Sequence, residues 1–434
     1  MDSVRRPFAY SESMLTRICL TAAVLLLGLA PAAEASTLTE KVASVVGHSS
    51  FAGSGNGYAV YDLTARRTIY FRNAGAELKP ASNMKLTTTA TLLGRFGAAH
   101  RLSTRVFASG TLTAGVLHGN LYLVGGGDPS FSTRDYAAKA FKGAAGLVPT
   151  LAAAVKAAGI HSVTGAVLGD ESYLSNVRTG PYWKASYWQD CAPLSALSVD
   201  EDLTSYGSIY GYHDPPLRSA QLFRWALIGD GVNVNGGAGT AWRPSSSRQI
   251  ASVVSPPMYR LTQEMDVPSD NYFAEVLNRD IAAAAGRPGT TLLGRVYTRT
   301  YLNSIGVGLS GAQLLDGSGL SVRDRLSAGQ LMALLLRVHD RPAYAWWFRN
   351  SLPVAGVGGT LSDRMKTGPA HGNAHAKTGT LDDASNLSGY VTTANGHLIV
   401  FSLLMNRDPY INVTAAHAVQ DRIVQTLAGA TPPA

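Results

Sequence analysis

Cysteine and charge are both scarce in this sequence. Its 434 residues include two cysteines, and Asp, Glu, Lys and Arg together make up 15%. Cys19 lies in a leader-like segment, which leaves Cys191 alone in a processed chain and excludes a disulfide-stapled framework. We expect Cys191 to be a buried small apolar residue rather than a nucleophile. The 46% hydrophobic content excludes a disordered chain and suffices for a large core.

Dense runs of positive charge are also absent, although the formal net charge is +8. A basic surface suits an anionic partner such as nucleic acid, a membrane or a wall polymer. Without a Lys/Arg tract, we predict no nucleic-acid binding. His371 and His375 are four residues apart, but they lie in an apparent loop without the Glu of a zinc-binding helix. We therefore predict no metal and no other cofactor.

The apolar run near the N-terminus is too short for a comfortable membrane span. It covers residues 18–30, whereas a spanning helix needs ~20 apolar residues. Arg17 precedes the run, and Ala33-Glu34-Ala35 follows it with the small-residue pattern of a cleavage site. We predict a signal peptide over residues 1–35, with a retained anchor as the alternative. The protein is then exported to the periplasm or the extracellular wall space, without a stable membrane span in the mature chain.

The pattern of apolar residues and turn residues changes twice along the remaining chain, which predicts three segments. Residues 36–101 combine a hairpin pattern with a helix that begins near Ser82, and residues 102–256 alternate short strand-like runs with Gly-rich turns. Residues 257–430 return to helical periodicity. We interpret the middle segment as a mostly β domain inserted into a catalytic domain. The individual elements predicted are strands at 58–63, 68–71, 104–108, 120–124, 163–168, 387–392 and 398–405, and helices at 147–158, 269–284, 326–339 and 413–427.

Three short motifs carry candidate chemistry. Each is common alone, but their order and their helix or strand-edge contexts are typical of penicillin-binding proteins and serine β-lactamases. The motifs are Ser82-Asn83-Met84-Lys85 (S-x-x-K), Ser269-Asp270-Asn271 (S-x-N) and Lys377-Thr378-Gly379 (K-T-G).

The first motif predicts an activated serine. Positions i and i+3 share a helix face, so Lys85 should direct its amine toward the Ser82 hydroxyl. A serine hydroxyl needs a base to take its proton, and a lysine can be that base only when burial or a cationic neighbour disfavours its charge. Lys377 is the candidate neighbour. Ser82 at a helix N-terminus also has free backbone N–H groups nearby for an oxyanion.

The other two motifs predict proton transfer and substrate binding. Ser269 is suited to relay a proton from Lys85 to the leaving group, and the Asn271 amide can hold Lys85 and a substrate amide together. Lys377 is suited to bind a C-terminal carboxylate. We expect the backbone N–H of Thr380 to complete the oxyanion hole with that of Ser82. The predicted substrate-binding strand edge therefore consists of Lys377, Thr378, Gly379 and Thr380.

At these residues the chain resembles the class C low-molecular-mass penicillin-binding proteins, the D-alanyl-D-alanine carboxypeptidase/endopeptidase family of peptidase family S13. The resemblance extends over nearly the whole mature chain. It rests on Pro80-Ala-Ser-Asn-Met-Lys-Leu86, Asn120-Leu-Tyr-Leu-Val-Gly-Gly-Gly-Asp-Pro129, Leu194-Ser-Ala-Leu-Ser-Val199, Asp316-Gly-Ser-Gly-Leu-Ser321 and Ala376-Lys-Thr-Gly-Thr-Leu381.

The resemblance implies an α+β fold, with a helix/antiparallel-sheet/helix domain interrupted between the first two motifs. It implies a serine-type D-Ala-D-Ala carboxypeptidase, also with DD-endopeptidase action, that takes peptidoglycan stem peptides and is acylated by β-lactams. It also implies a substrate contact from the insert, for which Asp170 is the candidate, with an ordinary turn aspartate as the alternative. Two other functions remain open, a serine β-lactamase or esterase and a non-catalytic peptidoglycan-binding or β-lactam-sensing module.

Overall fold

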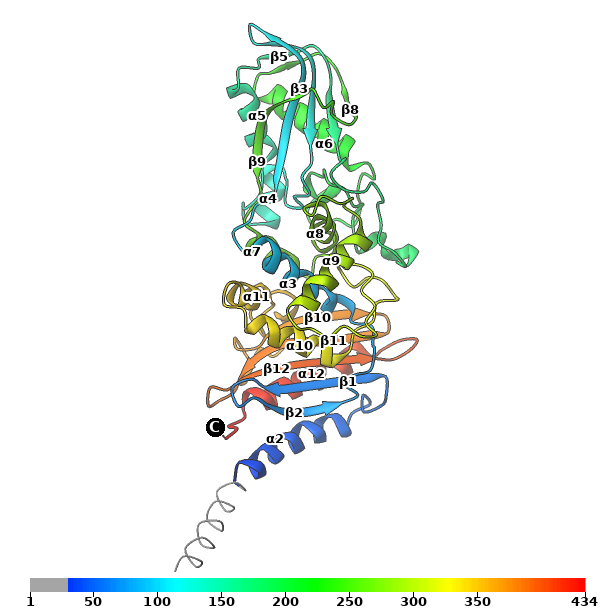
Figure 1. Cartoon of the computed structure of the whole chain (residues 1–434), viewed down its shortest axis with the longest axis vertical. Coiled ribbons are helices and arrows are strands. Elements are labelled where there is room, and N and C mark those ends of the chain that lie inside the picture. Colours follow the sequence, from blue (N-terminus) through cyan, green and yellow to red (C-terminus); the bar gives the residue numbers. More distant parts are fainter. Residues whose placement is uncertain (1–29, 434) are drawn as a thin grey trace, which may run out of the picture.

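The computed structural model describes residues 30–433 and has an elongated shape with one β-sheet near each end (Figure 1). Helices fill the space between the two sheets. The chain enters through α2 (Ala30–Gly47), whose buried side chains Leu38, Val42 and Val46 pack against β2 and α12. The predicted signal peptide lies mostly outside the described residues and stays a prediction. Its expected cleavage point, after Ala35, precedes the first of these packed side chains.

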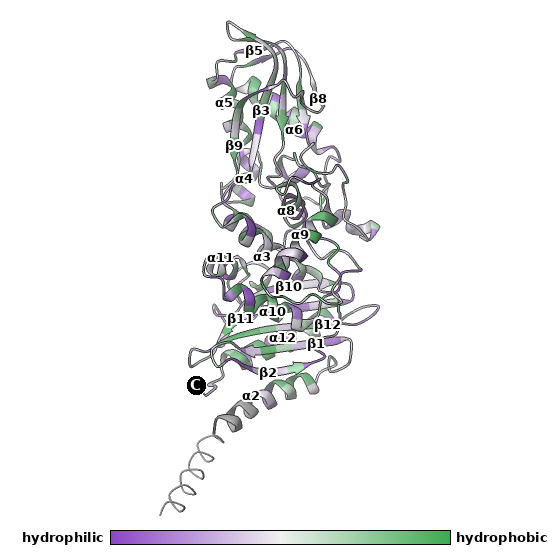
Figure 2. Ribbon diagram, viewed as in Figure 1, coloured by the Kyte–Doolittle hydropathy of each residue, from purple (hydrophilic) through white to green (hydrophobic). Residues whose placement is uncertain are grey.

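The lower sheet has five antiparallel strands in the order β10-β11-β12-β1-β2. Strand β12 lies at its centre and is almost wholly apolar, as Figure 2 shows, because helices cover the sheet on both faces. Strand β10 forms one edge and carries the K-T-G motif. The bounds are β1 (Asn56–Asp62), β2 (Arg67–Arg72), β10 (His375–Leu381), β11 (Ala384–Thr392) and β12 (Leu398–Asn406).

Two helices pack on one face of this sheet and a third packs on the other. Helices α2 and α12 (Val413–Ala428) contact each other and strands β2 and β11, while α10 (Ala328–His339) contacts β1 and β12. Local side chains fix where α12 and α10 begin. Asn412 accepts a hydrogen bond from Ala415 N at the start of α12, and Ser327 forms a capping box at the start of α10. The result is a helix/sheet/helix sandwich.

The upper sheet has seven strands, and all of them come from residues 103–254. Long antiparallel strands form one part of it and short parallel strands the other, and helices α5 and α6 pack against it. We propose that residues 102–256 form a separate domain. The bounds are β3 (Ser103–Thr113), β4 (Val116–Val124), β5 (Ser162–Val163), β6 (Val167–Asp170), β7 (Asn233–Val234), β8 (Ala238–Thr240), β9 (Arg248–Val254), α4 (Arg134–Ala140), α5 (Val148–Ala157) and α6 (Pro215–Gly229).

The helices between the sheets surround α3, which contacts α7, α8 and α9. Their buried faces form the largest hydrophobic core of the described chain. The bounds are α3 (Lys85–Phe96), α7 (Met258–Asp266), α8 (Asn271–Ala283), α9 (Thr291–Ser304), α11 (Ala345–Ser351) and the 3₁₀ turns η1 (Ala81–Met84), η2 (Ala185–Gln189), η3 (Asp200–Asp202) and η4 (Gly359–Leu361).

The expected α+β fold class is confirmed by this architecture. The predicted strand at 163–168 is wrong, because the chain forms two short strands there with Gly165 in the bend between them. A Cβ at Gly165 would meet the Gly119 carbonyl oxygen at 2.4 Å. Within residues 30–433, no helix has the length and apolar character to cross a bilayer.

Candidate active site

A tight turn presents Ser82 at the base of α3. Turn η1 holds Ser82, and α3 begins at Lys85, three residues later. Ala81 has a φ of +46°, a left-handed conformation that a residue with a Cβ rarely adopts. Such strain concentrates at functional sites, where the surrounding structure holds it in place. The strained residue directly precedes the predicted nucleophile.

Glycines allow two segments to lie against this turn. A Cβ at Gly379 would stand 2.7 Å from the Pro80 carbonyl oxygen and 3.1 Å from the Ser82 backbone nitrogen. A Cβ at Gly319 would stand 1.9 Å from the Ala81 carbonyl oxygen, and Gly319 also has a φ of +89°. Glycine at these positions therefore brings β10 and the loop at 316–321 into direct contact with the turn.

Lys85 is fully buried and joins three parts of the site. Its Nζ donates hydrogen bonds to Ser82 Oγ at 3.0 Å, to Asn271 Oδ1 at 2.6 Å and to the Ser318 carbonyl oxygen at 3.0 Å. These acceptors come from η1, from the start of α8 and from the loop at 316–321. The lysine thus has a fixed direction, and its hydrogen bond with Ser82 defines the path along which a proton can leave the hydroxyl.

Burial makes both lysines of the motifs easier to deprotonate. It lowers the pKa of Lys85 to about 8, although nearby carboxylates oppose the shift. Burial and the charge of Lys85 together lower the pKa of Lys377 to about 7, below that of Lys85. The two ammonium groups repel each other, so the pair gives up one proton readily near neutral pH. In the free protein Lys377 loses its proton first, and an anion bound beside Lys377 would move the remaining proton from Lys85 to Lys377.

A buried carboxyl group, Asp266, balances this pair from the end of α7. Its Oδ2 accepts hydrogen bonds from Thr89 Oγ1 at 2.6 Å and from Ser351 Oγ at 2.9 Å. Burial raises the pKa of Asp266 to about 6, and the positive charges of Lys377 and Lys85 act in the opposite direction. Asp266 therefore favours the protonated state of both lysines and links α7 to α3.

The S-x-N motif lies where α8 begins. Asp270 caps the helix by accepting a hydrogen bond from Phe273 N at 2.8 Å, and Ser269 before it has a left-handed φ of +67°. Asn271 Nδ2 donates to the Asp190 carbonyl oxygen at 2.9 Å. Ser269 and Asn271 line one small pocket of about 180 Å³. The Asn271 amide therefore connects Lys85 to the segment that contains Asp190.

Glu275 supports Lys85 from one turn further along α8. Its Oε1 accepts backbone hydrogen bonds from Gly317 at 2.8 Å and from Ser318 at 2.7 Å, and the Ser318 carbonyl oxygen accepts from Lys85. Burial raises the pKa of Glu275 to about 7. Asp316 closes the same loop by accepting from Gly319 N and Ser321 N. Two buried acids thus fix the carbonyl group that Lys85 contacts.

The K-T-G strand supplies the last part of the site. Lys377 is fully buried, and its Nζ donates to the Thr378 carbonyl oxygen at 3.2 Å. Thr378 Oγ1 donates to Thr360 Oγ1 at 2.7 Å, while Thr380 is exposed on the edge strand. An exposed edge of backbone N–H and C=O groups can pair with an extended peptide.

The structure does not bring Asp170 to this group. It lies at the end of β6 with its carboxylate buried, and it accepts hydrogen bonds from Ser172 N at 2.8 Å and Arg243 N at 2.7 Å. These are the contacts of a turn aspartate. They fit the alternative given with the prediction and do not test a substrate contact, so the role of Asp170 stays a prediction outside the proposal below.

Several residues of the site were not found from the sequence. Glu275 follows Asn271 by four positions, so the predicted helix already placed both on one face. The Gly-rich segment at 316–321 was recognised, but its contact with Lys85 was not predicted. Asp266, Thr360 and the Asp190 carbonyl group gave no sequence signal, because their partners are distant in the chain.

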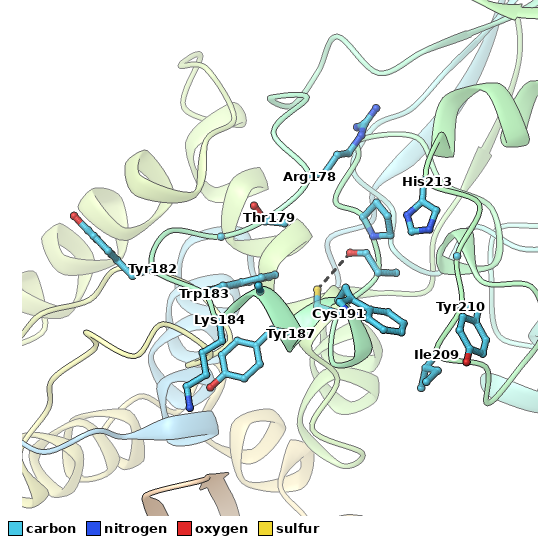
Figure 3. A pocket seen from close by; sticks show the side chains of 16 residues that line it. Arg178, Thr179, Tyr182, Trp183, Lys184, Tyr187, Cys191, Ile209, Tyr210 and His213 are labelled. Carbon is cyan, nitrogen blue, oxygen red and sulfur yellow. Dashed lines mark hydrogen bonds between the residues drawn. The ribbon is translucent and has the colours of Figure 1, made fainter. Parts of the chain in front are cut away.

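A larger cavity of about 430 Å³ adjoins the small pocket and shares Trp188, Cys191 and Ile209 with it. Figure 3 shows Trp183, Lys184 and Tyr187 near one another and Ile209, Tyr210 and His213 in a second group. Cys191 is buried here as expected, and burial raises the pKa of its thiol well above the usual value. Such a thiol is a weak nucleophile at neutral pH.

The chain is similar in sequence to known D-Ala-D-Ala carboxypeptidases. The D-Ala-D-Ala carboxypeptidase 3 (S13) family matches residues 38–208 and 207–429. A D-alanyl-D-alanine carboxypeptidase of Actinomadura sp. (strain R39) is 30% identical, with 93% of this chain and 88% of that protein covered. A carboxypeptidase of Mycobacterium tuberculosis, Rv3627c, is also 30% identical, with 80% and 75% covered.

Solved structures show the same fold. Penicillin-binding protein 4 of Haemophilus influenzae has a TM-score of 0.74 at 21% identity, with 90% of this chain and 97% of that chain covered. Its complex with a β-lactam has a TM-score of 0.70 at 21% identity, with 88% and 97% covered. Since the family match spans almost all of the described chain, the protein belongs to the D-Ala-D-Ala carboxypeptidase (S13) family, whose members are serine peptidases of cell-wall peptidoglycan.

Proposed function

We propose that this protein is a serine-type D-Ala-D-Ala carboxypeptidase that forms an acyl-enzyme on Ser82. Its substrates are peptidoglycan stem peptides that end in D-Ala-D-Ala, and cross-linked wall peptides enter by the same step when it acts as a DD-endopeptidase. β-Lactams acylate the same serine and leave slowly. The curated relatives named as carboxypeptidases and the β-lactam complex of the Haemophilus influenzae protein support this assignment.

The observation that carries the proposal is the contact between Lys85 Nζ and Ser82 Oγ at 3.0 Å. With its pKa lowered to about 8, Lys85 is partly neutral near pH 7 and can accept the hydroxyl proton as Ser82 attacks the carbonyl carbon. In this proposal, the backbone N–H groups of Ser82 and Thr380 hold the resulting oxyanion. The terminal carboxylate of the substrate binds beside Lys377 and raises the pKa of that lysine, so that Lys377 carries the positive charge of the pair in the complex and Lys85 is the base.

The remaining steps use the S-x-N motif. The departing D-Ala amine needs a proton. We propose that Lys85 supplies this proton and that the Ser269 hydroxyl relays it from Lys85 to the amine. Asn271 holds Lys85 through its amide oxygen at 2.6 Å and orients the substrate amide. Water then attacks the acyl-Ser82 ester and Lys85 accepts its proton; the ester bond to Ser82 Oγ breaks, Lys85 returns the proton to that oxygen, and the shortened peptide leaves with a new carboxylate.

The test compares Ser82→Ala with Ser246→Ala, a serine on the exposed surface of the upper sheet region. We expect Ser82→Ala to lose both covalent labelling by a fluorescent penicillin and D-Ala release from a defined muropeptide. The Ser246→Ala protein should keep both. Labelling that persisted in Ser82→Ala would refute the assignment of the nucleophile. Fast nitrocefin turnover would favour a β-lactamase, and binding of peptidoglycan without D-Ala release would favour a non-catalytic module.

A further inference from the structure

A strained turn from the upper part of the chain reaches the S-x-N motif. In η3, Asp200, Glu201 and Asp202 have φ values of +57°, +56° and +61°, three consecutive left-handed residues without a glycine. Contacts on both sides hold this turn. The Asp200 carboxylate accepts hydrogen bonds from Thr133 N and Thr133 Oγ1, both at 2.8 Å, and the Asp202 carboxylate accepts from His213 N at 2.9 Å.

The turn buries the Glu201 side chain against Asp270. Glu201 is 7% exposed and lines the same small pocket as Ser269 and Asn271. Tyr136 OH donates a hydrogen bond to Glu201 Oε1 at 3.1 Å. Asp270 lines this pocket too, and a hydrogen bond between the Glu201 and Asp270 carboxyl groups contributes to the pKa of each. Two carboxyl groups can share a hydrogen bond only when one of them carries the proton.

The surroundings assign that proton to Glu201. Burial raises the pKa of Asp270, but backbone hydrogen bonds from Phe273 and Tyr272 at the N-terminus of α8 and the charge of Lys85 act in the opposite direction. Within residues 30–433 the donor to Glu201 is the phenol of Tyr136, and burial together with the Asp270 charge raises the pKa of Glu201 well above its usual value. Asp270 is therefore the carboxylate and Glu201 the neutral acid.

We infer that neutral Glu201 is a positioning residue that holds the S-x-N motif against Lys85 by donating a hydrogen bond to Asp270. Asp270 caps α8, and its two neighbours in the motif are Ser269 and Asn271. A fixed Asp270 therefore fixes the direction of the Asn271 amide, which contacts Lys85. This inference rests on the proposed function, because it gives the motif its role in acylation.

The inference predicts a specific dependence on pH. The ionisable groups that face Glu201 are Tyr136 from α4, Asp200 beside it, Asp270, Tyr272 from α8 and Cys191. Because the pKa of Glu201 is raised in the folded protein, its contribution to stability is present at low pH and is lost as pH rises through that value. Above it, two adjacent carboxylates repel each other and the donor to Asp270 is gone.

Two variants of Glu201 separate the loss of its hydrogen-bond donor from a change in side-chain volume. Glu201→Gln keeps an N–H donor for Asp270 and cannot ionise, whereas Glu201→Leu has a similar volume and no donor. We expect Glu201→Gln to be acylated by fluorescent penicillin within about twofold of the wild-type rate at pH 7, and Glu201→Leu about tenfold or more slowly, the usual scale for a lost charge-assisted hydrogen bond. The ratio of the Glu201→Gln rate to the wild-type rate should rise from pH 7 to pH 9.5.

Melting temperatures test the same inference without a catalytic assay. They compare the wild type with Glu201→Gln, so the test remains valid even if the Glu201→Leu protein does not fold. The Tm of the wild type should fall relative to that of Glu201→Gln as pH rises from 6 to 9.5. Parallel Tm curves, equal rates for all three proteins, or equal loss in both variants would each overturn the inference. A Ser82→Ala protein that still labels would defeat the proposed function instead, and the Tm comparison would retain its meaning.

Discussion

At the scale of single residues, the site depends on two buried lysines that repel each other. In the proposed mechanism, Lys85 must be neutral to accept a proton from Ser82, and Lys377 must be charged to bind a carboxylate. Burial lowers the pKa of Lys85 to about 8 and that of Lys377 to about 7, and their mutual repulsion disfavours two charges near neutral pH. The substrate carboxylate adds a negative charge beside Lys377, which moves the remaining proton to that lysine and leaves Lys85 neutral.

The first prediction is therefore a pH profile for acylation by a penicillin. The second-order rate should rise with pH through an apparent pKa near 8, below the ordinary value for a lysine, because the deprotonated Lys85 is the reactive form. Stopped-flow or quenched labelling between pH 6 and 10 measures it. A rate that is flat over this range, or that rises only above pH 10, would contradict the role of Lys85.

Asp266→Asn provides the matched control for this profile. The Asp266 charge raises the pKa of both lysines, so its removal should move the rising limb to lower pH. Asparagine keeps an oxygen for Thr89 and Ser351, which preserves the packing of α7 on α3. An unchanged limb would mean that Asp266 has no electrostatic influence on the pair.

The contacts between these candidate catalytic groups could be predicted from the sequence only where the partners are near in the chain. Ser82 and Lys85 are one helical turn apart, so their contact followed from helix periodicity alone. Asp266 and the Ser318 carbonyl group approach Lys85 from distant segments, and no local pattern indicates a contact between residues so far apart. For Asp170 the substrate contact stays a prediction, because a buried turn carboxylate and a ligand-binding one look alike in sequence.

At the scale of elements, α8 orders the site through two side chains on one face. Asn271 contacts Lys85 directly, and Glu275 contacts it through the backbone of Gly317 and Ser318. Residues four apart on a helix are neighbours, so the first turn and a half of α8 determines both supports. The Asp270 cap sets where that turn begins.

The second prediction concerns Glu275→Ala. The substitution leaves two buried backbone N–H groups without an acceptor, each costing about 1–3 kcal/mol. We expect a lower Tm and a penicillin acylation rate about tenfold or more below wild type, since the Ser318 carbonyl group would lose its fixed position beside Lys85. Glu264→Ala on α7, which removes an i,i+4 ion pair with Arg260, is the control and should cost less than about 1 kcal/mol. Equal effects of the two substitutions would contradict this role.

The elements themselves were predictable where their pattern was long. The strand-like runs at 387–392 and 398–405 and the helix at 413–427 correspond to β11, β12 and α12 with small changes at the ends. Apolar runs buried on both faces and a capping Asn412 explain this agreement. Strands β5 and β7 have two residues each, which is shorter than any periodicity can reveal. Their parallel pairing depends on the whole sheet.

At the scale of the whole molecule, the segment between the two sheets connects the upper part of the chain to the site. After β6 it passes through residues 171–193, where the Asp190 carbonyl group accepts from Asn271. Lys184 forms an ion pair with Asp382 beside the K-T-G strand at 2.6 Å, but both side chains are about half exposed and such pairs contribute about 0–1 kcal/mol. A stronger anchor is the hydrogen bond from Trp183 Nε1 to Asp316 Oδ2 at 2.7 Å.

The hydrogen bond between Trp183 and Asp316 joins two segments for which the sequence predicted no mutual contact. Asp316 belonged to a segment that resembles the family, but no contact was predicted for it or for Trp183. Their side chains meet because the chain returns from the upper sheet to the centre of the molecule. A single sequence carries no local pattern that indicates such a return. In the structure, Asp316 also accepts a hydrogen bond from Ser321 N, in the loop that contacts Lys85.

The third prediction therefore compares Trp183→Phe with Trp242→Phe. The first substitution keeps an aromatic ring but removes the donor to Asp316, so the segment that carries the Asp190 carbonyl group is held less firmly against Asn271. We expect a penicillin acylation rate roughly fivefold to tenfold lower and a loss of about 1 kcal/mol in stability, the usual value of one hydrogen bond. Trp242 is 77% exposed on the upper part of the chain, and its substitution should change neither quantity. If both variants acylate at the wild-type rate, the upper part of the chain does not influence the site through Trp183, and the contact between Asn271 and Asp190 must be maintained by the lower core alone.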